Sequence, residues 1–131
     1  MKVKVIVVGV VMVCLSAAVA FGHHSFAGTY KLKDTIKVEG TITRLLVRNP
    51  HSMLEIESPD ESGKMQLWII EWAAGGQLAA TAWTKTLKPG DPVVAMGNPA
   101  RADGWRKMRL TSLKRTTDGL EWGRRPGEVV D

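Results

Sequence analysis

From residue 36 onwards, most of the chain alternates apolar and polar residues with a period of two. Ile36, Val38 and Ile42 alternate with charged and hydroxyl residues, which is the pattern of a half-buried strand. The run Leu45-Leu46-Val47 breaks the alternation, as at a bulge or a bend. Pro50 then ends the strand, because proline lacks the N–H group that a ladder needs. We therefore expect one long, bent first strand.

Four more strands and one short helix are expected to follow. Residues 54–57 and 65–72 predict a hairpin across a polar loop at 58–63, residues 93–96 follow a Pro-Gly turn, and a final strand follows Asp103-Gly104. The alanine-rich residues 77–83 predict a short helix.

This order predicts an all-β, mainly antiparallel small barrel that is similar to the oligonucleotide-binding (OB) fold, with the helix between the third and fourth strands. A five-stranded roll or an open sandwich would leave much the same pattern. The barrel does not supply a function, because OB folds host nucleic-acid, sugar, protein and metal binders alike.

The first 22 residues have the layout of a secretory signal peptide. Lys2 and Lys4 precede an apolar run from Val5 to Leu15, and small residues follow it. The run is shorter than the roughly 20 residues of a membrane-spanning helix, so cleavage is favoured over an uncleaved anchor. Cleavage after Ala20 and cleavage after Gly22 both satisfy the small-residue rule. Either one predicts a periplasmic or secreted protein that contacts the membrane only through its leader.

The remaining chain is expected to form one domain at residues 23–123, followed by a loose tail at 124–131. The single cysteine, Cys14, lies in the leader, so the domain has neither disulfides nor thiolate metal ligands. Without Lys2 and Lys4, 16 basic residues face 13 acidic ones, a net charge of +3. Strongly nucleic-acid-binding domains concentrate far more positive charge, so this balance says little about partners. Nucleic acid is not the expected partner, because an exported protein rarely meets it.

All three histidines lie in two short motifs, His23-His24 and Asn49-Pro50-His51. If the leader ends at Ala20, a free amine, two peptide nitrogens and the His23 ring form a square-planar set suited to Cu(II) or Ni(II). If it ends at Gly22, His23 offers its own amine and ring. About 27 residues separate the two motifs, so only folding can bring them together.

These residues predict a metal site whose candidate ligands are His23, His24, His51 and Glu71, with Met53 or Met96 as soft thioethers. Copper is the favoured ion, because it is available outside the cytoplasm and accepts both nitrogen and thioether ligands. Zinc is the alternative, since three imidazoles and a water make an open zinc site. The structural alternative is that His51 caps a turn and His23-His24 is an exposed chain start.

Several motifs together resemble a family of small exported bacterial proteins, a domain of unknown function. They are His23-His24-Ser25-Phe26 after the leader, the strand at 38–42, Asn49-Pro50-His51, residues 68–71, and Trp83-Thr84 followed by Leu87-Lys88-Pro89-Gly90-Asp91. The resemblance covers roughly residues 23–123 and implies a single exported domain without an established activity. The chain departs from the family pattern after Glu71, where residues 72–75 replace a Gly-rich segment and residues 77–82 lack the usual arginines.

Aromatic and basic residues suggest further binding positions. Trp68 and Trp72 share one strand face and are expected in the core. Trp105 and Trp122 lie beside turns and are expected to be accessible, and Trp105 and Asn49 are the candidate ligand-binding residues. The basic residues on and near the last predicted strand would suit an anionic envelope component or a protein partner: Arg101, Arg106, Lys107, Arg109, Lys114 and Arg115.

No phosphate loop or paired catalytic acids occur in the sequence. The neighbours His51 and Ser52 would point to opposite faces of an extended chain, so they do not predict a catalytic pair. We therefore expect a binding protein rather than an enzyme. The first hypothesis is an exported copper-binding protein, and the alternative is a metal-free OB-like binding or adaptor domain for a protein or envelope component.

Overall fold

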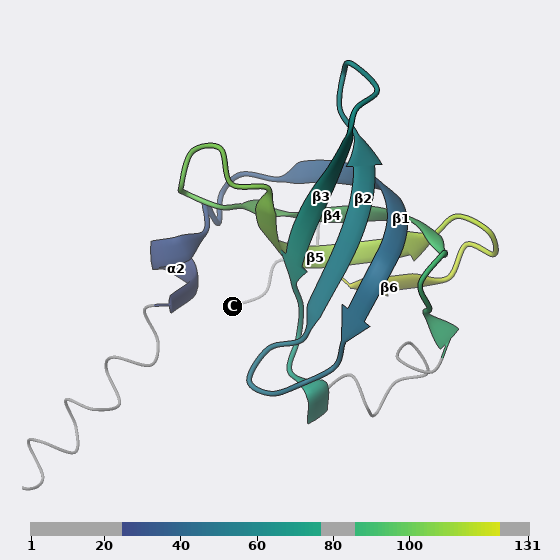
Figure 1. Cartoon of the computed structure of the whole chain (residues 1–131). Coiled ribbons are helices and arrows are strands. Elements are labelled where there is room, and N and C mark those ends of the chain that lie inside the picture. Colours follow the sequence, from purple (N-terminus) through teal and green to yellow (C-terminus); the bar gives the residue numbers. More distant parts are fainter. Residues whose placement is uncertain (1–24, 77–85, 124–131) are drawn as a thin grey trace, which may run out of the picture.

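The structure, a computed structural model, describes residues 25–76 and 86–123. One short helix precedes six strands (Figure 1): α2 (Ser25–Thr29), β1 (Ile36–Leu46), β2 (Met53–Pro59), β3 (Met65–Glu71), β4 (Pro92–Pro99), β5 (Lys107–Arg115) and β6 (Glu121–Gly123). Within these residues, no helix has the length and hydrophobicity needed to cross a membrane.

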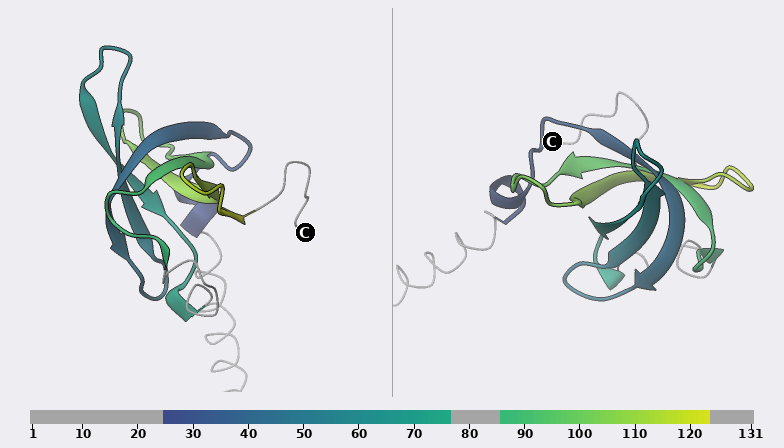
Figure 2. Two further views of the ribbon diagram at one scale, coloured as in Figure 1. Left: turned by 90° about the vertical axis from the view of Figure 1, so that its right-hand side faces the viewer. Right: turned by 45° about the horizontal axis from the view of Figure 1, so that its top comes forward.

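Strand β1 joins the two halves of the sheet. Its residues Ile36 to Thr41 pair with β4, and its residues Thr41 to Leu46 pair with β2, both antiparallel. The register shifts between Ile42 and Arg44, so a bulge bends the strand where it passes from one partner to the other. Figure 2 shows the resulting curvature of β1 around the barrel.

A parallel pairing closes the sheet into a barrel. The strand order is β3-β2-β1-β4-β5-β6, and β3 also pairs with β5 at Ile69–Lys107, Ile70–Met108 and Glu71–Arg109. Five strands therefore form the closed barrel, and β6 pairs with β5 outside it. The predicted all-β barrel with OB-like topology is confirmed.

The barrel interior holds one hydrophobic core. It is built from inward-facing residues of all five barrel strands and two residues that flank them: Val38, Ile42, Leu54, Ile56, Ile70, Trp72, Leu87, Val93, Ala95, Met108, Leu110 and Leu113. Trp72 is buried, and Trp68 packs partly buried against the same cluster. The predicted core role of this pair is confirmed.

Three details differ from the sequence-based expectations. The bulge in β1 lies at Ile42 to Arg44 rather than at residues 45–47. The strand after Asp103-Gly104 is followed by β6, a three-residue strand too short for an alternation pattern. The predicted helix at 77–83 lies outside the described residues; the short helix that the structure describes, α2, instead precedes the first strand.

The backbone of β2 lies too close to Gly40 of β1 for any side chain at this position. A Cβ atom at this position would overlap the carbonyl oxygen of Glu57 and press on the Ile56 side chain. We expect Gly40→Ala to lower the free energy of unfolding by about 1–3 kcal/mol, the usual cost of overpacking. Chemical denaturation measures this. The matched control is Gly28→Ala in α2, where no heavy atom lies within 4 Å of the added carbon; an equal loss in both variants would contradict the prediction.

Candidate functional site

The Glu71 carboxylate connects three other side chains at the end of β3. Its Oε1 atom lies 2.6 Å from His51 Nδ1, and its Oε2 atom accepts a short hydrogen bond from the Tyr30 hydroxyl. Lys107 Nζ lies 3.6 Å from the same Oε2 atom. Both carboxylate oxygens are therefore occupied by partners from separate segments of the chain.

The strand pattern explains why these side chains meet. Ile70 and Trp72 are buried in the core, so Glu71 points outwards between them. The parallel register sets Ile69 opposite Lys107 and Glu71 opposite Arg109, which brings both basic residues to the outer face beside Glu71. The closure of the barrel thus builds one side of the site.

The turn before β2 supplies His51. Ser52 is fully buried; its hydroxyl lies 3.2 Å from the Arg48 nitrogen, and its backbone pairs with Trp72 and Ala73. Because neighbouring residues on an extended chain face opposite sides, burying Ser52 turns His51 outwards. The Asn49-Pro50 peptide bond is cis, and the Gly76 N–H donates to Asn49 Oδ1 at 3.3 Å.

Helix α2 covers the other side of His51. The Phe26 ring lies 4.9 Å from the His51 ring and 6.2 Å from the Tyr30 ring, measured between centroids. Arg109 lies over the Phe26 ring, with its Cζ atom 4.6 Å from the ring centroid. Arg101 Nε also donates to the Ala27 carbonyl at 2.7 Å. These contacts fix the start of the domain against the barrel.

The environment of Tyr30 raises the pKa of its hydroxyl group. It is 1% exposed, and its hydroxyl donates to a carboxylate. Burial, followed by the hydrogen bond and the negative charge of Glu71, raises the pKa of Tyr30 well above its ordinary value. The phenol therefore stays a donor, and it holds Glu71 in place over the whole physiological pH range.

The cluster leaves one nitrogen of His51 available. A carboxylate only accepts hydrogen bonds, so a neutral His51 carries its hydrogen on Nδ1, facing Glu71, and has a lone pair on Nε2. The side chain is 33% exposed. A carboxylate-held imidazole with a free Nε2 is suited to binding a metal ion or accepting a proton.

A family of unknown function, DUF6152, matches residues 10–109 of the chain. The chain belongs to this family. The match includes both histidine motifs and every residue of the Glu71 cluster. A search of curated proteins finds no match. The family resemblance expected from the sequence is therefore confirmed as far as a domain of unknown function.

Solved structures with a similar fold are mitochondrial single-stranded DNA-binding proteins from S. cerevisiae. Rim1 in one crystal form has 14% sequence identity and a TM-score of 0.51, with 63% of this chain and 92% of that chain covered. A second form of Rim1 gives 14% identity and a TM-score of 0.50 over 63% and 93% of the two chains. At this identity the likeness concerns the OB fold.

The fold brings together only part of the predicted metal set. His51 and Glu71 are in contact, and Met53 is the cross-strand partner of Glu71, whereas Met96 lies in a separate groove. His23 and His24 lie outside the described residues. Within residues 25–76 and 86–123, no three histidine, cysteine or acidic side chains gather in a metal-binding arrangement.

The two predicted ligand-binding residues lie apart from each other. Asn49 accepts the Gly76 N–H on the turn beside His51. Trp105 lies on the β4–β5 loop and is 61% exposed, as expected, whereas Trp122 is partly buried with its ring edge-on to Trp72 at 5.2 Å. The sequence did not identify Tyr30 or Phe26 as site residues. Phe26 belongs to the first histidine motif, which is a signal that could have found it, whereas the only signal for Tyr30 is that it is the single tyrosine of the chain.

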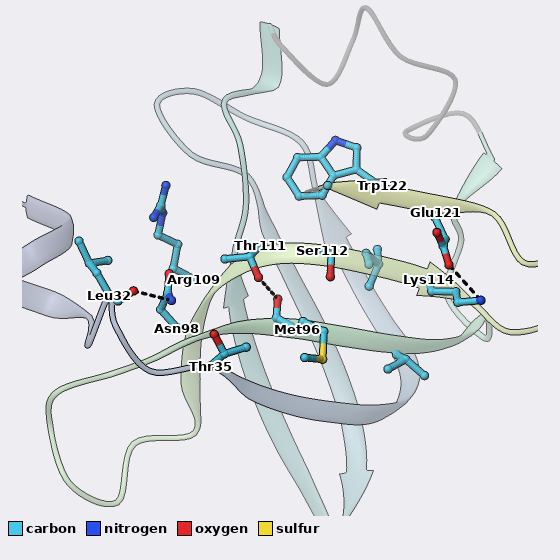
Figure 3. A pocket seen from close by; sticks show the side chains of 13 residues that line it. Leu32, Thr35, Met96, Asn98, Arg109, Thr111, Ser112, Lys114, Glu121 and Trp122 are labelled. Atoms are coloured by element: carbon cyan, nitrogen blue, oxygen red, sulfur yellow. Dashed lines mark hydrogen bonds and ion pairs between the residues drawn. The ribbon is translucent and has the colours of Figure 1, made fainter. Parts of the chain in front are cut away.

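A groove of about 980 Å³ lies along β4, β5 and β6, and Arg109 beside Glu71 is one of its lining residues (Figure 3). Its apolar lining comes from three strands and the segment before β1: Leu32, Val94, Met96, Leu113 and Trp122. Asn98 closes one end by donating to the Leu32 carbonyl, and the Lys114–Glu121 ion pair lies at the other.

The pH dependence of Tyr30 provides a test of the cluster. Because the folded-state pKa of Tyr30 is raised, the folded protein holds this proton more tightly than the unfolded chain, whose phenol has the ordinary pKa of 10.0. The stabilisation is therefore fully present below pH 10 and is lost as the pH rises above it. Tyr30 is the only tyrosine, so phenolate absorbance reports it alone. We expect it to ionise only together with unfolding; ionisation in the folded protein near pH 10 would contradict this.

Proposed function

We propose that this protein is exported and binds a transition-metal ion, with copper favoured over zinc, through His51 and the His23-His24 pair. The observation that carries the proposal is the His51–Glu71 contact of 2.6 Å, which orients the ring through Nδ1 and leaves Nε2 without a partner among residues 25–76 and 86–123. Metal-binding histidines commonly donate their other N–H to a carboxylate, which fixes the tautomer and strengthens the ligand.

The fold supports a meeting of the two histidine motifs. His24 precedes Phe26 by two residues, and the Phe26 ring packs against the ring of His51. Two residues of extended chain span at most about 7 Å. The chain length therefore allows the first motif to reach His51, although 27 positions separate His24 from it in sequence.

Glu71 has a different role in this proposal from the one expected of it. Both of its oxygens already accept hydrogen bonds or face a cation, so it serves to hold His51 rather than to bind the ion directly. The ion would then be held by imidazoles and by the terminal amine, a nitrogen set that suits Cu(II). Binding displaces protons from these nitrogens, so affinity should fall at low pH.

The test is titration of the purified protein with Cu(II) and Zn(II), with the N-terminal residue determined by mass spectrometry. We expect His51→Ala to weaken copper binding by at least about tenfold, and Glu71→Gln to weaken it by about 10- to 100-fold through loss of ring orientation. The matched control is Thr43→Ala, an exposed residue of β1. Unchanged affinity in His51→Ala with a blocked amino terminus would contradict the proposal.

The groove favours a second candidate, a metal-free binding or adaptor domain for a protein or envelope component. Its apolar floor between β4, β5 and β6 is large enough for several side chains of a partner. In this candidate, the Asn49-Pro50-His51 segment is a structural turn that anchors α2.

Met96→Arg would test the second candidate, because Met96 lines the groove. Val47→Arg is the matched control, since Val47 is an exposed apolar residue outside it. Affinity capture from a periplasmic extract is expected to retain one partner with the wild type and with Val47→Arg, and to lose it with Met96→Arg. Equal retention by all three would rule out the groove as the binding surface.

Nucleic-acid binding has less support from the side chains of this protein than the names of its structural neighbours suggest. Lys107 and Arg109 hold the Glu71 cluster, and Arg115 forms ion pairs with Asp91 and Asp118. Trp105 is the one exposed tryptophan among the described residues. A fluorescence titration with single-stranded oligonucleotide would detect stacking on it.

A further inference from the structure

Strand β3 has a free side over its first half. All seven of its residues pair with β2, whereas only Ile69, Ile70 and Glu71 pair with β5. Among the described residues, no strand pairs with the β5-facing side of residues 65–68. In Figure 1 this part of β3 belongs to the β2–β3 hairpin that projects beyond the barrel.

The backbone groups that face this free side can be identified. Ile69 N donates to the Arg106 carbonyl at 2.9 Å, away from β2, whereas Trp72 N donates to the Ser52 carbonyl of the segment leading into β2 at 2.8 Å. Backbone groups alternate direction along a strand. The N–H and C=O groups of Leu67 and Met65 therefore point, like those of Ile69, towards the side without a partner strand.

The side chains of the same two residues are exposed and apolar. Met65 is 53% and Leu67 is 47% exposed. Natural edge strands are commonly protected by lysine, proline or a bulge, and residues 65–68 contain none of these. An open apolar edge of this kind is a site for the addition of another strand.

We propose that a second copy of this chain adds its own β3 here, antiparallel, to form a twofold dimer. Residues opposite each other in an antiparallel pair lie on the same face. A twofold pairing centred on Gln66 sets Met65 against Leu67 of the partner, and one centred on Leu67 sets the two Leu67 side chains together. Either register makes the edge complementary to itself, as an isologous interface requires.

The second copy is favoured over a free peptide because its edge is already ordered. The Asp60 carboxylate accepts hydrogen bonds from Ser62 N at 2.9 Å, Lys64 N at 3.0 Å and Gln66 Nε2 at 2.8 Å, which fixes the hairpin turn. A flexible peptide would lose backbone entropy on binding to so short an edge, whereas a preformed strand loses little. This interface does not involve His51 and is independent of metal binding.

Sedimentation equilibrium of the purified protein tests the proposal. We expect a reversible monomer–dimer equilibrium, and Leu67→Lys to weaken dimerisation by at least about tenfold. Val47→Lys, which changes another exposed apolar residue, should leave the dissociation constant unchanged. A wild-type protein that stays monomeric at all concentrations reached would overturn the proposal.

Proline substitution distinguishes strand pairing from simple apolar contact. Leu67→Pro removes an N–H that faces the free side and leaves the β2 ladder intact, so we expect a folded monomer by circular dichroism and sedimentation. The comparison is Met65→Gln, which removes an apolar side chain from the same edge but keeps the backbone N–H. A Leu67→Pro protein that is folded and dimerises like the wild type would overturn strand addition.

Discussion

The carboxylate of Glu71 is the interaction on which the site depends. It stands at the end of the short parallel pairing that closes the barrel, and it connects β3 to the chain start through Tyr30, to the turn before β2 through His51 and to β5 through Lys107. A partly buried carboxylate needs such partners, since an unpaired buried charge is strongly unfavourable. Barrel closure and the histidine site are therefore one structural unit.

This arrangement brings Phe26 of the first histidine motif into contact with His51 of the second. Phe26 rests on the ring of His51, and Arg109 rests on Phe26, so the residues that follow His23-His24 are held where His51 is exposed. The basic residues of β5 also have partners within the domain: Glu71 for Lys107, the Phe26 ring for Arg109, Glu121 for Lys114, and Asp91 and Asp118 for Arg115. These contacts leave less unpaired positive charge for an anionic partner than the sequence suggested.

Both histidine motifs and the parallel closure fall within the DUF6152 family match. The likeness to single-stranded DNA-binding proteins concerns the fold alone, because the sequence identity is only 14%. On this chain the outer wall near that closure carries the Glu71 cluster. The function proposed here therefore rests on these side chains and not on the barrel that carries them.

The sequence by itself determined the strands, because a period-two pattern and its Gly and Pro breaks are local properties. It also marked His51 and Glu71 as site residues and placed Trp72 in the core. It did not reveal Tyr30, the position of the β1 bulge or the three-residue β6, since each depends on pairing with distant segments. Only the tertiary structure decided that Glu71 holds His51, because the contact needs Met53 opposite Glu71 in the β2–β3 register and a buried Ser52 that turns His51 outwards. The same holds for Lys107: its place beside Glu71 comes from the β3–β5 register, between residues about 38 positions apart, and no local pattern encodes it.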